Sequence, residues 1–117
     1  LPNQYENMIS MTTLDYIEQK YRTATLTELC EMLHLPMHVL SKMIKKTTDF
    51  NFKELLQRKR LSKAVELMCD TDLPISDVIA AVGYENNSYF HRVFKERYHV
   101  TPRAFRLENK KSDQVRL

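Results

Sequence analysis

The sequence predicts an all-α fold of seven helices, and three of its features support that prediction. Among 117 residues there are one glycine and four prolines, which leaves few positions for the tight turns that join β-strands. Apolar residues recur at helical spacing along most of the chain, and residues suited to capping stand before several of these segments. A hydrophobic content of 43% is enough for a packed core, and no apolar run approaches the roughly 18 residues of a membrane span.

The expected helices cover about 3–21, 25–34, 36–48, 52–69, 75–82, 86–98 and 101–109. In the first, the apolar packing positions begin at Tyr5 and Met8 and continue at helical spacing. Several helix starts carry a side chain that can accept from the first backbone amides. The expected N-caps are Thr25 or Thr27, Asn51, Asp72 or Ser76, and Thr101, which is followed by proline at the first helical position.

Turns are expected at His34 and at Gly83, and the helices before Asp49 and His99 are expected to end in left-handed turns. Gly83 is the only glycine, and Asn and Ser residues suited to starting a helix follow it. Asp, Asn and His are the non-glycine residues that tolerate the left-handed conformation best. Short turns of this kind join neighbouring helices rather than separate domains.

Charge is distributed in alternating blocks along the chain, although the net charge is only +3. Residues 37–63 carry eight Lys and Arg against two Asp and Glu, and residues 88–111 carry seven against two. Between them, residues 64–87 carry five acidic residues and no Lys or Arg. Two basic blocks separated by an acidic one indicate two contacts with a polyanion.

The chain also contains an internal repeat. Residues 27–33 align with 76–82 at an offset of 49, and residues 40–45 align with 90–95 at an offset of 50. Lys42 then corresponds to Arg92 and Lys45 to Lys95, all at positions expected to be exposed. A short helix, a tight turn and a longer basic helix make a helix-turn-helix, whose usual partner is DNA. A pair of helical hairpins is the less specific alternative.

Chemistry other than binding has little support. Cys30 and His34 are one helical turn apart, which could hold a metal or a nucleophile, but the repeat places Cys30 at a core position and His34 at a turn. Catalytic, phosphate-loop and metal-ligand constellations are missing from the sequence. We therefore expect no enzyme, no cofactor and no metal. A helical protein-interaction module that binds an acidic protein partner remains the alternative function.

Four stretches resemble the AraC/XylS family of bacterial transcription regulators: RLSKAVELM at 60–68, ISDVIAAVGY at 75–84, SYFHRVFK at 88–95 and TPRAFR at 101–106. The resemblance covers roughly residues 9–107. It implies two homeodomain-like helix-turn-helix subdomains joined by a long central helix. The family usually has glycine where Asp49 and His99 stand, and a Ser or similar cap where Pro36 stands.

The resemblance implies promoter binding, usually for activation, with both recognition helices in successive major grooves of double-stranded DNA. Such grooves are about 34 Å apart. Residues 1–51 and 71–109 would each hold a helix-turn-helix, residues 52–70 the connecting helix and 110–117 a flexible tail. Further implied partners are RNA polymerase and a sensing or dimerisation domain of the same protein. The lack of an initiating Met fits a piece of a longer cytoplasmic, nucleoid-associated protein without a signal peptide.

Eleven residues are expected to meet DNA. Arg92 can bind a guanine through two donors, Asn87 suits adenine, and the backbone amides at 86–88 can hold a phosphate. Lysine makes a less directional base contact than arginine, so the first recognition helix is expected to position more than it specifies. Arg60 and Arg103 are secondary phosphate candidates. The expected DNA-binding residues are His38, Ser41, Lys42, Lys45, Lys46, Asn86, Asn87, Ser88, His91, Arg92 and Lys95.

Overall fold

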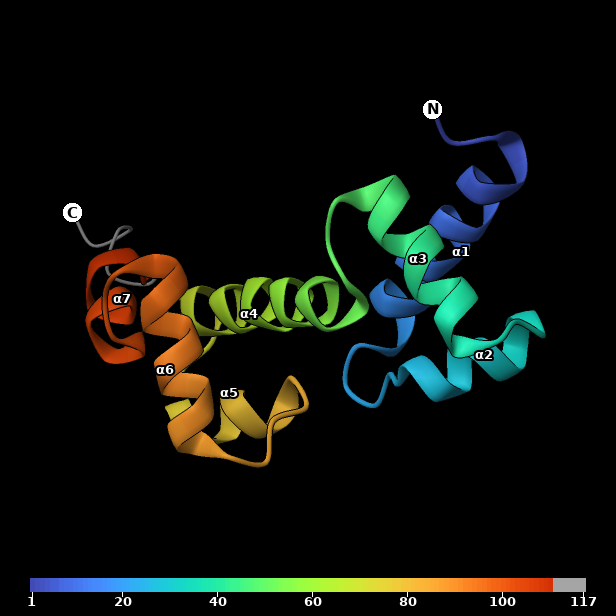
Figure 1. Ribbon diagram of the computed structural model, residues 1–117. Coiled ribbons are helices and arrows are strands. Elements are labelled where there is room, and N and C mark those ends of the chain that lie inside the picture. The colour runs from blue at the N-terminus through green and yellow to red at the C-terminus, as the bar shows by residue number, and fades with distance from the viewer. Residues whose placement is uncertain (111–117) are drawn as a thin grey trace. The chain divides into compact units, whose positions relative to one another are not determined.

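Seven α-helices follow one another in a computed structural model that describes residues 1–110 (Figure 1). Most of the predicted tail, 110–117, lies outside the described residues. The chain divides into two compact units, Leu1–Lys59 and Arg60–Leu117. The helices are α1 (Gln4–Lys20), α2 (Leu26–Leu33), α3 (Met37–Thr48), α4 (Phe52–Asp70), α5 (Ile75–Ala81), α6 (Asn87–Tyr98) and α7 (Pro102–Asn109). The predicted all-α fold of seven helices is confirmed.

The first unit packs α1, α2, α3 and the start of α4 around one core. Its buried residues are Ile9, Tyr16, Ile17, Ala24, Leu29, Leu40, Ile44 and Phe52. The Tyr16 hydroxyl accepts from the Thr25 amide at 3.0 Å and donates to the Glu28 carboxylate, which fixes the start of α2 against α1. Burial and the neighbouring Glu28 carboxylate raise the pKa of Tyr16. The hydroxyl therefore remains a donor at neutral pH.

Tyr5 and Met8 do not belong to that core, contrary to the prediction. They are 48% and 53% exposed, and the first residue of α1 in the core cluster is Ile9. The first turn of α1 has a polar role instead. Asn3 and Glu6 form a reciprocal capping box, and Glu6 also pairs with Lys46 of α3 at 3.0 Å. Helical spacing marked the correct face of α1 but not where the core beneath it ends.

The second unit packs α5, α6, α7 and the later part of α4 around Phe90 and Phe94. Both rings are fully buried, and Phe94 lies 5.7 Å, centroid to centroid, from Phe105 of α7. The core also contains Leu61 and Met68 of α4 and Val78 of α5, which are fully buried. This core holds one side of α6 and leaves the opposite side to solvent.

The cation Arg106 ties α7 to the end of α4. Its Nε donates to the carbonyl of Met68 at 3.1 Å and its Nη1 to that of Leu73 at 2.6 Å. Lys110 adds a bond to the carbonyl of Thr71 at 2.7 Å and an ion pair with Asp72. The last carbonyls of a helix have no partner within it, so Arg106 satisfies one carbonyl in the last turn of α4, and both cations hold the segment that follows the helix.

The predicted cap of α5 is wrong. Pro74 precedes α5 with φ −54° and ψ 149°, and no side chain caps the helix. Ser76 lies inside α5, and the carboxylate of Asp72 is taken by Lys110, whose hydrogen bond lowers the pKa of Asp72. The proline fixes the entry conformation by itself, because its ring restricts φ to the value that a helix start needs.

Candidate nucleic-acid interface

The same backbone turn occurs at equivalent places in the two units. His34 (φ 55°) and Gly83 (φ 104°) both have positive φ. In the first turn the amide of Leu35 donates to the carbonyl of Cys30 at 3.1 Å, and in the second Tyr84 donates to Ile79 at 3.1 Å. These pairs differ by the offset of 49 found in the sequence. Each unit therefore contains a short helix, the same turn and a longer helix, which is a helix-turn-helix.

The entrance to α6 leaves backbone donors facing outward. The side chain of Asn86 accepts from the amide of Tyr89 at 2.9 Å, so the N-cap satisfies one of the first amides. Asn87 and Ser88 are the first two residues of α6, and both are exposed. Their amides have no carbonyl partner one turn earlier in the helix, and a helix N-terminus favours anions. This end of α6 can accept a phosphate group.

One side of α6 is buried and the other is exposed to solvent. Phe90, Val93 and Phe94 face the core, while the predicted DNA-binding residues of this helix are exposed. His91 lies back along the helix, with its Nδ1 2.8 Å from the carbonyl oxygen of Asn87. The structure thus brings together on one exposed side Asn87, Ser88, His91, Arg92 and Lys95, with Asn86 at the cap.

Arg92 is held between two side chains of its own helix. Its Cζ lies 5.0 Å from the centre of the Tyr89 ring, and its Nη1 donates to the Glu96 carboxylate at 3.1 Å. The Tyr89 ring in turn lies 5.8 Å from the ring of Tyr84. Burial raises the pKa of Tyr84, and Arg60 stacks on its ring at 5.1 Å. Arg92 is thus presented in an ordered position on an exposed surface.

The corresponding helix of the first unit, α3, has a comparable exposed side. His38, Ser41, Lys42, Lys45 and Lys46 are all exposed, and Leu40 and Ile44 are fully buried on the other side. Two of its cations have protein partners. Lys45 Nζ donates to the carbonyl of Asp49 at 2.8 Å, and Lys46 pairs with Glu6 of α1. Pro36, at the N-cap, makes no side-chain capping bond.

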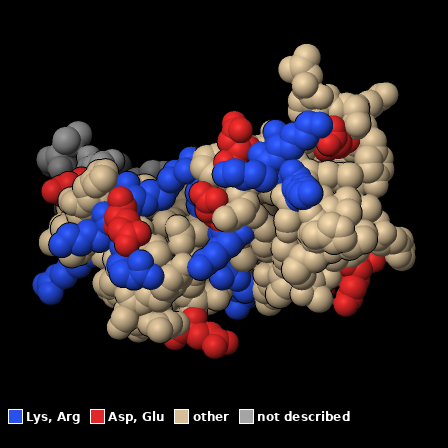
Figure 2. All heavy atoms as spheres, viewed as in Figure 1, with Lys and Arg blue, Asp and Glu red and all other residues tan. Residues whose placement is uncertain are grey.

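Figure 2 shows how charge is arranged on the visible face of each unit. Lys and Arg side chains lie over α3 with an acidic side chain at their edge, and positive and negative side chains lie side by side over α6. The difference follows from the sequence, because Glu96 stands in α6 where Lys46 stands in α3 at an offset of 50. The exposed side of α6 therefore carries mixed charge, and the cations on the exposed side of α3 have no acidic residue among them.

Comparison with known proteins identifies the family. A family model described as "Helix-turn-helix domain" matches residues 29–108. Regulatory protein PocR of Salmonella typhimurium is 33% identical over 83 residues, which cover 71% of this chain and 27% of that protein. The chain belongs to the AraC/XylS family of transcription regulators. It is a DNA-binding helix-turn-helix domain of that family, whose members are regulators and not enzymes.

Solved structures agree with the fold of an AraC/XylS domain. The C-terminal domain of AraT, a response regulator from Geobacillus stearothermophilus, superposes with a TM-score of 0.82 at 33% identity, covering 87% of this chain and 86% of that one. A probable AraC family regulator from Rhodopseudomonas palustris shares the fold with a TM-score of 0.80 at 17% identity, over 87% and 97% of the two chains. The chain spans about a third or less of the length of the first curated relatives.

The family membership favours DNA binding over the alternative of a helical module for an acidic protein. Cys30 and His34 join no group of three or more possible metal ligands among residues 1–110. No helix in that part of the chain is long and apolar enough to cross a membrane. Within residues 1–110, the exposed sides of α3 and α6 therefore remain the candidate functional site of this AraC/XylS domain.

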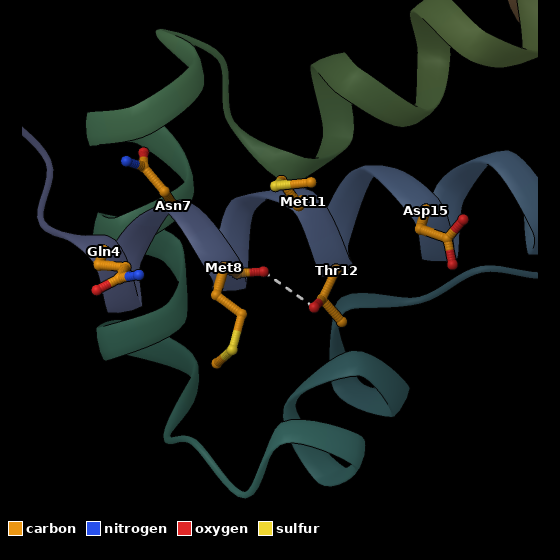
Figure 3. Close-up of a pocket in the computed structure, with 6 residues that line it drawn as sticks. All are labelled: Gln4, Asn7, Met8, Met11, Thr12 and Asp15. Atoms are coloured by element: carbon orange, nitrogen blue, oxygen red, sulfur yellow. Dashed lines mark hydrogen bonds between the residues drawn. The ribbon is translucent and has the colours of Figure 1, made fainter.

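A hollow of about 590 Å³ lies along α1, on the first unit of the AraC/XylS domain (Figure 3). All of its lining comes from this one helix: Gln4, Asn7, Met8, Met11, Thr12 and Asp15. The hydroxyl of Thr12 donates to the carbonyl of Met8 at 2.9 Å and is thereby turned to the backbone. Reactive groups do not converge there, so this hollow is a surface feature of α1 and not a catalytic pocket.

Sequence reasoning missed the protein partners of the cations that are predicted to bind DNA in this AraC/XylS domain. Glu96 follows Arg92 by four residues, a spacing that brings side chains together on a helix, so this pair was detectable. The pair between Glu6 and Lys46 joins residues 40 positions apart, and only the packing of α1 on α3 reveals it. Arg103 is exposed, as a secondary phosphate candidate must be.

Proposed function

We propose that α6 and α3 are the two recognition helices of this AraC/XylS domain, each inserted into a major groove of double-stranded promoter DNA. The observation that carries the proposal is the repeated turn, which presents Lys42 and Arg92 at equivalent exposed positions of the two helices. Successive major grooves on one face of DNA are about 34 Å apart, one helical turn. A site for this domain then consists of two adjacent half-sites.

The second recognition helix supplies most of the base reading. Arg92 uses Nη1 for Glu96, which leaves the edge formed by Nε and Nη2 for the O6 and N7 atoms of a guanine. Asn87, in the first turn, suits an adenine, and the amides of Asn87 and Ser88 hold the adjacent phosphate. Ser88, His91 and Lys95 flank these contacts on the same exposed side.

The first recognition helix contributes more to affinity and register than to base choice. Its side chains toward DNA are His38, Ser41, Lys42, Lys45 and Lys46, and its cations are all lysines. Lysine binds a phosphate well but reads a base with little directional preference. Its missing side-chain cap leaves the entrance to α3 with one fewer fixed hydrogen bond than α6 has.

The setting follows from the family. We propose that the domain acts at promoters in the cytoplasm, associated with the nucleoid, and that RNA polymerase is its protein partner there. Its curated relatives are longer proteins, so a sensing or dimerisation domain elsewhere in the full protein is the expected source of regulation. The boundaries we propose are 1–51 and 71–109 for the two helix-turn-helix segments, with 52–70 connecting them.

Selection of bound sequences from random double-stranded DNA tests the proposal. The expected product is a motif with two half-sites about 10 base pairs apart, centre to centre. Arg92→Ala should then cost about 1–3 kcal/mol on the selected site and remove the preference for guanine at one position. Loss of binding by the same factor on every sequence would contradict base reading by Arg92. Failure to enrich any motif would contradict sequence-specific binding.

A further inference from the structure

The surroundings of Arg92 contain a carboxylate where a DNA-binding surface would ordinarily avoid one. Glu96 is exposed, with 63% of its side chain open to solvent, and lies on the same side of α6 as Arg92, which is 61% open. Arg92 and Glu96 are separated by 3.1 Å between Nη1 and Oε1. A negative charge at this place opposes the approach of phosphate, so the presence of Glu96 on a helix that is proposed to bind DNA needs an explanation.

The first helix-turn-helix shows that the carboxylate is not required by the fold. At the offset of 50, Lys46 of α3 stands where Glu96 stands in α6, although both helices have the same turn before them and the same ending. Lys46 is engaged by Glu6 of α1, outside the recognition helix. The carboxylate next to the reading cation is therefore particular to the second recognition helix.

We propose that Glu96 is a specificity-determining residue that restricts how Arg92 can use its charge. This inference rests on the proposed base-reading role of Arg92. With Nη1 bound to Glu96 and the guanidinium stacked on Tyr89, the Nε and Nη2 edge is presented outward as a fixed pair of donors. A guanine matches such a pair, because its O6 and N7 are two acceptors side by side on the groove edge.

On non-cognate DNA the same arrangement lowers affinity. Without Glu96, the side chain of Arg92 would reorient toward the nearest phosphate and contribute to binding at any sequence. Glu96 competes with phosphate for the guanidinium, whereas the repulsion of the backbone by its own charge weakens binding to every sequence alike. Specificity is a difference between two affinities, so weakening the complex with non-cognate DNA is as effective as strengthening the complex with the cognate site. Glu96 weakens the non-cognate complex, and Arg92 strengthens the cognate one.

The weakness of an exposed ion pair suits this role. Pairs four residues apart on a helix surface contribute little to stability, and salt screens them. Such a pair biases the position of Arg92 without preventing small adjustments when DNA binds. The stack on Tyr89, itself packed on Tyr84, supplies a second constraint that salt affects less.

The test compares Glu96→Gln with the unaltered chain on the selected DNA site and on random DNA. Glutamine keeps the size of the side chain and removes its charge. We expect affinity for random DNA to rise by about threefold, affinity for the selected site to change less, and the specificity ratio to fall accordingly. Glu66→Gln is the matched control, because Glu66 is also exposed on a helix and paired within it, with Lys63 at 3.6 Å, and the substitution changes the net charge equally.

The same comparison in an Arg92→Ala background separates the two roles. If Glu96 acts through Arg92, the loss of specificity caused by Glu96→Gln should disappear there. A fall in specificity of the same size in both backgrounds would overturn the inference, as would an unchanged specificity ratio matching that of Glu66→Gln. A failure of the underlying function is recognised independently, because Arg92→Ala would then leave the preference for guanine intact.

Discussion

Asp49 and His99 occupy the same left-handed backbone position at the ends of α3 and α6. Their φ angles are 66° and 65°, and their amides donate to the carbonyls of Lys45 and Lys95 at 3.0 and 2.8 Å. Neither residue is glycine, although a residue without a Cβ takes this conformation with less strain. The left-handed endings expected from the sequence are confirmed at both positions.

Replacing His99 with glycine should stabilise the second unit. We expect His99→Gly to raise the free energy of unfolding by about 0.5–1 kcal/mol, because relief of left-handed strain outweighs the extra freedom of the unfolded chain. Denaturant unfolding measures the change. Arg97→Gly is the control inside the last turn of α6, where glycine should instead cost about 1 kcal/mol. Equal destabilisation by both substitutions would show that the ending of α6 is unstrained.

The cap and the phosphate-binding role at the start of α6 can be distinguished at Asn86. Its side chain accepts from the Tyr89 amide at 2.9 Å, so Asn86→Ala should cost about 1 kcal/mol of stability. Asn86→Asp keeps the acceptor but adds a negative charge. It should leave stability nearly unchanged in thermal unfolding and weaken DNA binding in a titration. Unimpaired DNA binding by Asn86→Asp would argue against a phosphate at these amides.

Lys45 should contribute to DNA affinity without contributing to base choice. Removal of one phosphate contact lowers the steepness of the salt dependence by about 0.9, so Lys45→Ala should flatten it by that amount on every sequence. Binding titrations across a series of salt concentrations provide the slope. Lys20→Ala, an exposed lysine at the end of α1, serves as the comparison and should leave the slope unchanged. A change confined to one DNA sequence would instead indicate that Lys45 reads a base.

The first unit should lose stability in acid through Glu6. The capping hydrogen bond with Asn3 and the bond from Lys46 lower the pKa of Glu6 in the folded protein. The unfolded chain therefore takes up a proton at higher pH than the folded one. The stabilisation by ionised Glu6 is present above the ordinary pKa of a glutamate and is lost as the pH falls through the lowered value.

Unfolding of Glu6→Gln at neutral pH and at about pH 3 tests this dependence. The variant should be less stable than the unaltered chain at neutral pH, and the difference should shrink in acid. Glu31→Gln is the control, since Glu31 is exposed on α2 and forms no ion pair within residues 1–110. A difference that is independent of pH would mean that the Glu6 charge adds nothing to folding.

Local signals predicted most of the fold. Thr25 and Thr101 are N-caps as expected, and Asn51 forms a capping box with Glu54, since both bonds join residues three apart. The internal repeat also predicted the structure correctly, because residues aligned by the repeat, such as His34 and Gly83, form the same backbone turn. The failed cap before α5 had a tertiary cause: Asp72 is bound by Lys110, the residue after α7, and Pro74 sets the entry.

The exposed sides of α3 and α6 were predictable, but the ion pair of Lys46 was not. Helical spacing places Arg92 and Lys42 outward once Phe90 and Leu40 are assigned to the core. Whether a cation is already engaged depends on neighbours brought by folding, as with Lys46 and Glu6. The carboxylate of Glu96 was within reach of sequence reasoning, and only its functional meaning required the arrangement of Tyr89 and Arg92 in three dimensions.

The turns at His34 and Gly83 and the endings at Asp49 and His99 make α3 and α6 equivalent supports for the side chains proposed to meet DNA. The hydrogen bonds of the turns match at an offset of 49, and those that end the helices, from Asp49 to Lys45 and from His99 to Lys95, match at an offset of 50. Residue n of α3 and residue n + 50 of α6 therefore occupy equivalent places on their supports. Exposed side chains can therefore be transplanted from one helix to the other without disturbing either core. Duplication of this kind gives a protein a second copy on which altered DNA preference can be tried while the first continues to hold the site.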